Sequence, residues 1–290
     1  MINEELLQQL ENLQSILNNN VGGLFGGNRK SKLRGSSCEF ADYRDYVAGD
    51  DITKIDWNAF ARTENLYQKL YLDERQMHTK IYLDASRSMA YGDTQKAAQA
   101  LRLGAAFAYL SLNEMDKVSV YVIREKEVTQ VIGGMVGRDS FVGSVGCLND
   151  VVFEGDSMIS DALRYEDIGR GDGLSVLISD FLTDNDYEDA IQRFSERRRD
   201  LLCVQVLSRE ELNPQSRGKM HFFDSENREL VYRKNINREI ARAYKDALRY
   251  MTEHLQAFCA ARGAAFVQVA EDETLENVFF GKLVDMGVLK

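Results

Sequence analysis

The chain has 290 residues, enough for one large domain or a domain with attachments, and its 44% hydrophobic content can bury a full core. Its formal net charge of −10 argues against nucleic acid and anionic membranes as main partners, because both require a basic surface. Four scattered cysteines without a C-x-x-C pair, and three distant histidines, argue against a zinc site or a disulfide framework. The cysteines are expected in or near the core. The polar start MINEELLQQL and the lack of an apolar run of about 18 residues predict a cytoplasmic protein without a membrane span.

Residues 1–35 are predicted to be an amphipathic helix followed by a glycine-rich, basic linker. Leu6, Leu10, Leu13 and Leu17 recur at helical spacing within residues 3–18. We expect this helix to dock on the main domain rather than on a partner. The basic residues that follow it, Arg29, Lys30, Lys32 and Arg34, fit a solvated linker better than a surface for nucleic acid or lipid.

Residues 36–76 are predicted to be a short block of irregular and β structure that packs on the core. Turn residues at positions 49–51 divide it, and residues 66–72 alternate as in a strand. Trp57 is expected to be a packing anchor. Arg44 and Arg62 lie among many acidic residues, so we expect them to form ion pairs.

Residues 77–290 alternate between predicted strands and helices, which favours a mostly parallel sheet flanked by helices. The predicted strands cover residues 79–84, 117–123, 127–132, 174–179, 201–207 and 264–269. The predicted helices cover residues 96–112, 140–148, 158–165, 187–198, 235–262 and 274–289, with a β-hairpin at residues 220–232. Gly263 is a suitable C-cap for the long helix.

The residues that carry chemistry follow predicted strands. Asp84, Ser86 and Ser88 form a D-x-S-x-S turn after the first strand, Asp180 follows the strand at 174–179, and Ser157 lies in a loop that enters a helix. Ligands of open α/β sheets bind at the carboxyl ends of strands. If these strands are neighbours, two carboxylates and three hydroxyls converge, and a hard cation such as Mg²⁺ prefers such oxygen ligands. Helix capping is the competing explanation for each residue taken singly.

These residues resemble the metal-ion-dependent adhesion site (MIDAS) of von Willebrand factor A (VWA) domains. The flanking segments resemble the bacterial DUF58 family more closely, over roughly residues 30–270, with a pattern E-F-x-x-x-R-x-Y-x-x-G-D-D followed by I-D-W-x-x-x-A-R. The matching residues are Glu39-Phe40, Arg44, Tyr46, Gly49-Asp50-Asp51, Ile55-Asp56-Trp57, Ala61-Arg62 and Ser179-Asp180-Phe181.

The resemblance implies a VWA-like, Rossmann-type α/β fold. It also implies that Ser86, Ser88 and Ser157 are direct metal ligands, with Asp84 and Asp180 holding the ion directly or through water. The ion is expected to be Mg²⁺, with Mn²⁺ and Ca²⁺ as alternatives, and to leave one position open for an Asp or Glu of a partner protein. A MoxR-type AAA+ ATPase is the partner that the resemblance implies, which predicts a non-catalytic adaptor or chaperone component.

A metal-dependent hydrolase that uses the same site is the main enzyme alternative. It requires a general base near the metal, and no histidine lies in the site loops. A haloacid dehalogenase-type phosphatase requires a second acid where Ser86 stands. A P-loop requires more than Gly281-Lys282, and a serine hydrolase requires a G-x-S-x-G motif that neither serine of the turn has.

Overall fold

The structure is a computed structural model in which the chain forms two compact units. The larger unit comprises Met1–Leu24 together with Met77–Lys290, and the smaller unit is Phe25–Gln76. It describes residues 2–20, 39–47, 50–72, 77–90, 95–114, 116–171, 173–183, 187–214, 218–223, 231–236 and 238–289. The predicted linker after the first helix lies outside these residues, as does Cys38.

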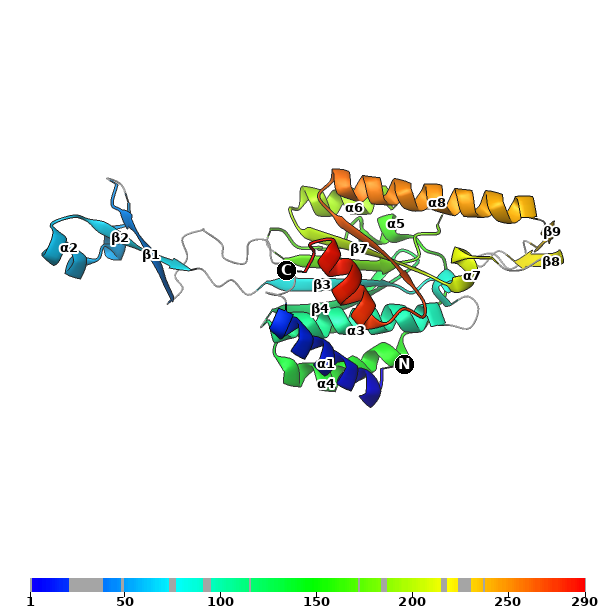
Figure 1. The fold of residues 1–290 in the computed structure, drawn as a ribbon, viewed down its shortest axis with the longest axis horizontal. Helices are drawn as coiled ribbons and strands as arrows, with labels where there is room; N and C mark the ends of the chain where they lie inside the picture. The colour runs from blue at the N-terminus through cyan, green and yellow to red at the C-terminus, as the bar shows by residue number, and fades with distance from the viewer. Residues whose placement is uncertain are drawn as a thin grey trace. The chain divides into compact units, whose positions relative to one another are not determined.

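The larger unit is built on a six-stranded sheet, as predicted (Figure 1). In sheet order its strands are β10 (Ala265–Ala270), β7 (Asp200–Leu207), β6 (Leu174–Ser179), β3 (His78–Asp84), β4 (Lys117–Arg124) and β5 (Glu127–Met135). All neighbours are parallel except β4 and β5, which form an antiparallel hairpin. Every residue of β6 is buried, because helices cover both faces of the sheet at this strand.

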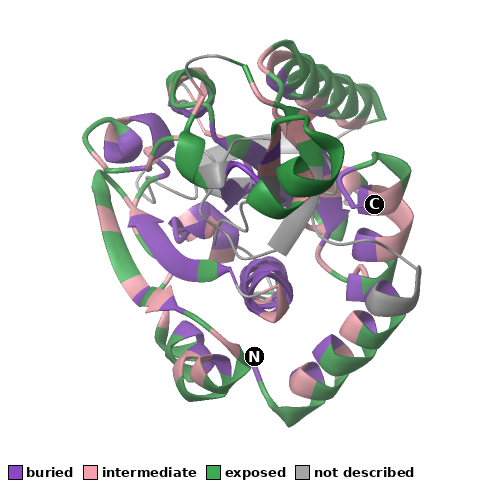
Figure 2. Ribbon diagram, turned by 90° about the vertical axis from the view of Figure 1, so that its left-hand side faces the viewer, coloured by how far each residue is buried: buried purple, intermediate pink, exposed green. Residues whose placement is uncertain are grey.

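Helices cover both faces of this sheet: α5, α6 and α8 lie on one side, and α1, α3 and α4 lie on the other (Figure 1). Their bounds are α1 (Glu4–Asn20), α3 (Gln95–Asn113), α4 (Arg138–Ser144), α5 (Ile159–Leu163), α6 (Glu188–Glu196) and α8 (Arg238–Ala261). Short turns of helix complete this set: η2 (Arg87–Ala90), η3 (Val145–Asp150) and α7 (Arg209–Leu212). Figure 2 shows buried residues on the strands and on the inward sides of the helices, while the outward sides are exposed.

The N-terminal helix docks on the main domain, as predicted. Leu10 and Leu13 are fully buried, and Leu6 and Leu17 are nearly so. The guanidinium of Arg102 on α3 donates to the Gln9 side chain over 3.1 Å. The apolar stripe read from the leucine spacing is therefore the face that contacts α3.

The C-terminal part follows the prediction with one difference. The amphipathic helix α8 buries Leu248, Leu255 and Cys259 and stops before Gly263, whose φ of 73° is the left-handed conformation of a helix C-cap. The closing helix is not a regular α-helix: Asn277–Leu283 forms a π-helix, η4, with Phe279 packed against Phe107 of α3 at a ring-centroid distance of 4.9 Å. Hydrophobic spacing does not distinguish these two helix types over so few turns.

A second hairpin forms from β8 (Gly218–Phe223) and β9 (Val231–Ile236), which pair antiparallel as predicted, and its turn lies outside the described residues. Cys203 and Cys259 are buried and free of disulfides, also as predicted. The prediction was wrong for Cys147, which is exposed in η3, because this 3₁₀ segment buries only Val145 and Leu148.

The smaller unit contains a two-stranded antiparallel sheet. Its elements are β1 (Glu39–Asp45), η1 (Ile52–Lys54), α2 (Trp57–Thr63) and β2 (Tyr67–Leu72). The Asp56 carboxylate caps α2 by accepting from the backbone N–H groups of Asn58 and Ala59. It also accepts from the Tyr43 hydroxyl over 2.8 Å, and these donors, the hydroxyl above all, lower the pKa of Asp56 to about 2.

Acidic residues of this unit have local structural roles. Arg44 forms the expected ion pair, with Asp50, and the Asp51 side chain accepts from the Thr53 N–H at the start of η1. Within this unit, Trp57 is 60% exposed and contacts Phe60 edge-on, because it occupies the first position of a short helix that buries none of its residues. Its role as a packing anchor stays a prediction, since it concerns the contact of this unit with the core. The packing of residues 36–76 on the core stays a prediction.

Candidate functional site

The turn after β3 arranges the first group of site residues. Asp84 is the last residue of the buried strand, and its Oδ1 accepts from the backbone N–H of Ser86 over 3.0 Å. The chain then enters η2, which carries Ser88, and the hydroxyl oxygens of Ser86 and Ser88 lie 3.1 Å apart. The D-x-S-x-S spacing therefore brings one carboxylate and two hydroxyls together within a single turn.

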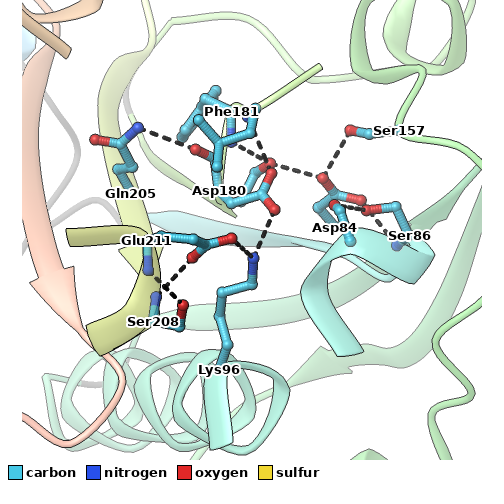
Figure 3. Close-up of polar contacts among 12 residues, drawn as sticks. Asp84, Ser86, Lys96, Ser157, Asp180, Phe181, Gln205, Ser208 and Glu211 are labelled. Carbon is cyan, nitrogen blue, oxygen red and sulfur yellow. Dashed lines mark hydrogen bonds and ion pairs between the residues drawn. The ribbon is translucent and has the colours of Figure 1, made fainter. Parts of the chain in front are cut away.

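Two further loops meet this turn at the Asp84 carboxylate (Figure 3). The hydroxyls of Ser157 and Ser179 donate to Oδ2 over 2.8 and 2.6 Å. The loops are also joined to each other, since the Thr183 hydroxyl donates to the Ser157 carbonyl. This convergence follows from the topology, because β3 and β6 are parallel neighbours and end at the same edge of the sheet.

Asp180 follows β6 and is paired with a buried lysine. The Lys96 ammonium lies 2.9 Å from Asp180 Oδ2 and 2.8 Å from Glu211 Oε1 (Figure 3). Backbone and amide groups hold the acidic loop in place: the Leu182 N–H donates to Asp180 Oδ1, and the Gln205 side chain donates to the Asp180 carbonyl. Lys96 comes from the first turn of α3, so this helix contributes directly to the site.

Glu211 is positioned by its own helix. It is the third residue of α7, where it forms a capping box with Ser208: each side chain accepts from the backbone N–H of the other. The same carboxylate reaches Lys96 through its other oxygen. A residue that looks like an ordinary capping partner therefore also takes part in the ionic cluster.

The charges at this edge are unbalanced. Among the described residues, Lys96 is the cation that pairs with Asp180 and Glu211, and the neighbouring Asp84 accepts hydrogen bonds from two hydroxyls and a backbone N–H. Burial, and then the charge of Asp180, raises the pKa of Asp84. Burial lowers the pKa of Lys96, but the two carboxylates in contact with it outweigh burial and raise its pKa, so it stays protonated. In the described part of the chain, this cluster therefore holds more carboxylates than cations.

Sequence reasoning located most of this cluster. Asp84, Ser86, Ser88, Ser157 and Asp180 lie together at the carboxyl edge of the sheet, and all five are at least 90% buried. Their role as metal ligands stays a prediction.

Three partners were missed. Ser179, Lys96 and Glu211 were not predicted as site residues. Ser179 was part of the matching segment Ser179-Asp180-Phe181, where it was noted only as the neighbour of Asp180. For Lys96, the signal in the sequence was a lysine on the apolar face of the helix predicted at residues 96–112.

The donor set suits a hard cation. The described residues contain no cluster of three or more His, Cys, Asp or Glu side chains that could hold a metal by themselves. Any ion at this edge is therefore held by serine hydroxyls together with carboxylates, which are ligands that Mg²⁺ accepts and Zn²⁺ rarely selects. The surplus of buried negative charge fits the same kind of ion.

The sequence matches the family model described as "Protein of unknown function DUF58" over residues 42–254. The chain belongs to the DUF58 family. A relative of this DUF58 protein is an uncharacterized protein of Mycobacterium tuberculosis, 23% identical over 229 residues, which cover 77% of this chain and 71% of the relative.

Solved structures similar to the DUF58 chain include VWA proteins. The conserved hypothetical protein BatB from Bacteroides thetaiotaomicron has a TM-score of 0.43 at 15% identity, covering 73% of this chain and 98% of that one. The SpRpn10 VWA domain has a TM-score of 0.39 at 11% identity, covering 71% and 94%. The sheet order and flanking helices of the DUF58 protein agree with the predicted VWA-like α/β fold.

Some similar structures are described as carrying metal, and one of them is described with zinc. Proximal thread matrix protein 1 from the mussel byssus, with a zinc occupied MIDAS motif, has a TM-score of 0.41 at 10% identity, covering 74% of the DUF58 chain and 46% of its own. The metal is a property of that protein.

The cytoplasmic prediction is corrected by the same comparison. An aerotolerance-related membrane protein from Bacteroides fragilis, with a TM-score of 0.39 at 15% identity, covers 73% of this chain and 98% of its own. This similarity contradicts the cytoplasmic prediction, because net charge and a polar N-terminus do not determine the compartment. In the part of the DUF58 chain that the structure describes, each helix is too short or too polar to cross a bilayer.

Proposed function

We propose that this DUF58 protein is a Mg²⁺-dependent protein-interaction module that captures a carboxylate of a partner protein. The observation that carries the proposal is the excess of carboxylates over cations among the described residues of this edge. Asp180 and Glu211 share the ammonium of Lys96, Asp84 accepts from neutral donors, and the hydroxyls of the D-x-S-x-S turn lie beside them. Burying uncompensated carboxylates is costly, so the cluster favours an added cation.

Ser86, Ser88 and Ser157 would hold the ion, with Asp84 and Asp180 contacting it directly or through water. The bound ion supplies positive charge at the edge of the sheet, where an Asp or Glu of a partner can reach it. The partner that the family resemblance suggests is a MoxR-type AAA+ ATPase, for which this chain acts as an adaptor or chaperone component.

The hydrolase alternative gains no support from His78 or His254. His78 begins β3 at the opposite edge of the sheet from Asp84, and His254 lies on the exposed side of α8, where it contacts Glu188. A metal-dependent hydrolase requires a base close to the ion. We therefore retain the interaction module as the proposed function.

Calorimetric titration of the metal-free full chain with MgCl₂ tests the ion site. We expect wild type to bind Mg²⁺ and Ser86→Ala, which removes one hydroxyl ligand, to bind it at least about tenfold more weakly. The matched control is Ser195→Ala, an exposed serine on α6 whose hydroxyl donates to the Arg262 carbonyl. Equal binding by all three proteins would falsify the ion site.

Partner capture is tested separately with the purified MoxR-type ATPase of the same organism. We expect the two proteins to associate in MgCl₂, and the complex to dissociate in EDTA and to be weak with Ser86→Ala. Association that EDTA leaves unchanged would exclude capture through the ion, whatever the calorimetry shows.

A further inference from the structure

A second polar cavity lies at the other edge of the same sheet. It has a volume of about 430 Å³ and is lined by the first residues of β3 and β4, His78 and Lys117, together with Arg199, which precedes β7. Because β3, β4 and β7 are parallel, this is their amino edge, and the Asp84 cluster is at their carboxyl edge. The cavity is thus independent of the proposed function.

A buried arginine forms one wall of this cavity. Arg199 is 6% exposed, and its guanidinium donates to the Ser175 hydroxyl over 2.9 Å and to the carbonyls of His78 and Leu174 over 2.6 and 2.8 Å. All three acceptors are neutral, and the described residues include no carboxylate in an ion pair with Arg199. Burial lowers the pKa of this guanidinium, the expected effect of a desolvated cation.

The backbone is shaped around this arginine. Gly173 has a φ of 143°, and a Cβ there would lie 2.6 Å from an Nη atom of Arg199 and 2.8 Å from the His78 carbonyl. Glycine is therefore required at this position for two reasons, conformation and close approach. The chain thus holds a charged group where the described residues offer it no ion pair.

A buried lysine lies in the same cavity. Lys80 is 6% exposed, and its ammonium donates to the Asp167 carbonyl over 2.5 Å and lies 5.6 Å from the centre of the Tyr121 ring. Its pKa is lowered by burial, which outweighs the opposing effect of Asp167. Lys80 therefore adds a second desolvated cation with neutral hydrogen-bond partners.

The rim adds more positive charge. Lys117 and Arg170 are exposed and line the cavity, and neither forms an ion pair with an acid in the described part of the chain. Asp167 is the single carboxylate among the described lining residues, and Glu166 and Asp200 act on the buried cations from outside the cavity. Four cationic side chains face one carboxylate, in a protein whose net charge is −10.

His78 contributes polarity rather than charge. Burial, and then the charges of Lys80, Lys117 and Arg199, lower its pKa to about 4, so it is neutral near pH 7. Its Nε2 lies 2.9 Å from the Ser119 hydroxyl oxygen. The cavity therefore also offers an imidazole and a hydroxyl, groups that hydrogen-bond to oxyanions.

We propose that this cavity binds a phosphate-type oxyanion, either free phosphate or the phosphate group of a small ester. A dianion supplies the charge that Arg199 and Lys80 lack, and the planar guanidinium and the mobile lysine on the rim match its oxygens. The volume lies within the range of about 300–1,000 Å³ typical of small-molecule sites, so there is room for an attached organic group.

The test is calorimetric titration of the full chain with sodium phosphate at constant ionic strength set with NaCl. The cavity variant is Lys117→Gln with Arg170→Gln, both exposed residues whose replacement leaves the buried cations in place. The matched control is Arg238→Gln with Arg242→Gln, two exposed residues near the start of α8, which removes the same charge from the opposite end of the unit.

We expect the cavity variant to bind phosphate at least about tenfold more weakly than wild type, and the control to stay within about twofold. An equal loss in both variants, or no saturable binding by wild type up to about 20 mM phosphate, would overturn the proposal. A parallel titration with AMP distinguishes the two sources: tighter binding than phosphate identifies a phosphate ester, and weaker or equal binding identifies the free anion.

A second measurement locates the site without any variant. Phosphate should shift the imidazole NMR signals of His78 and leave those of His254 on α8 unchanged, whereas the same ionic strength of NaCl should shift neither. Equal shifts of His78 and His254 would show that phosphate acts through general screening and would refute a site at the amino edge.

Discussion

Replacing Lys96 with methionine removes the positive charge that joins Asp180 and Glu211. Methionine is similar in length and apolar, so it fills the space of the lysine stem without its ammonium. The change leaves Asp180, which is fully buried, and Glu211, whose side chain is 17% exposed, without their shared cation. Three carboxylates then remain close together.

The expected cost follows from the geometry. Two unit charges 2.9 Å apart attract each other by about 6 kcal/mol at an effective dielectric constant of about 20. Desolvation of the lysine, which the variant avoids, offsets part of this attraction. We therefore expect Lys96→Met to lower the free energy of unfolding by about 3–5 kcal/mol, the usual cost of leaving one partner of a buried pair uncompensated.

Urea denaturation in EDTA measures this cost from the shift in midpoint at an unchanged slope. Repeating the experiment in MgCl₂ at equal ionic strength tests the link to the proposed ion. If Mg²⁺ replaces the missing positive charge, it should stabilise Lys96→Met by at least about 1 kcal/mol more than it stabilises wild type, because the lysine no longer competes for Asp180.

The control is Lys126→Met, which removes a lysine paired with Asp161 at 3.4 Å on the surface. The Lys126 side chain is 66% exposed and that of Asp161 is half-buried, so loss of this solvent-screened pair should cost less than about 1 kcal/mol. If Lys96→Met costs as little as the control, the buried cluster does not contribute to stability as argued. If Mg²⁺ stabilises wild type and Lys96→Met equally, the lysine and the ion do not share a site.

Two further predictions concern other residues of β3, Tyr82 and His78. The Tyr82 hydroxyl is buried and has no hydrogen-bond partner among the described residues. We expect Tyr82→Phe to leave the urea midpoint unchanged or to stabilise the fold by up to about 1 kcal/mol; a clear loss would mean that the hydroxyl is satisfied. His78 has a folded pKa of about 4, below its usual 6.5, so the unfolded chain takes up a proton as pH falls from 6.5 to 4 and stability drops. Over this pH range, His78→Gln should lose about 1 kcal/mol less unfolding free energy than wild type; the difference is modest because solvent screens a half-buried ring. Parallel curves of stability against pH for the two proteins would contradict the lowered pKa.

The sequence was sufficient for the fold class and for the position of the main site. Alternating strands and helices predict a parallel sheet, and parallel strands that end in polar turns predict a site at their shared edge. Asp84 and Asp180 could be assigned to one edge because Asp84 ends one buried strand and Asp180 directly follows another. The leucine spacing of α1 likewise predicted a docked face without knowledge of what it contacts.

The tertiary structure decided which charges meet. Lys96 and Asp180 are 84 positions apart, and Arg199 reaches the carbonyl of His78 across 121 positions. Local spacing shows which side of a helix or strand is buried, but it does not show which element lies opposite. The π-helix at Asn277–Leu283 and the basic cavity at the amino edge both depend on such contacts. Chain-local patterns therefore specify elements and their ends, whereas the balance of buried charge at both edges arises only when the sheet is assembled.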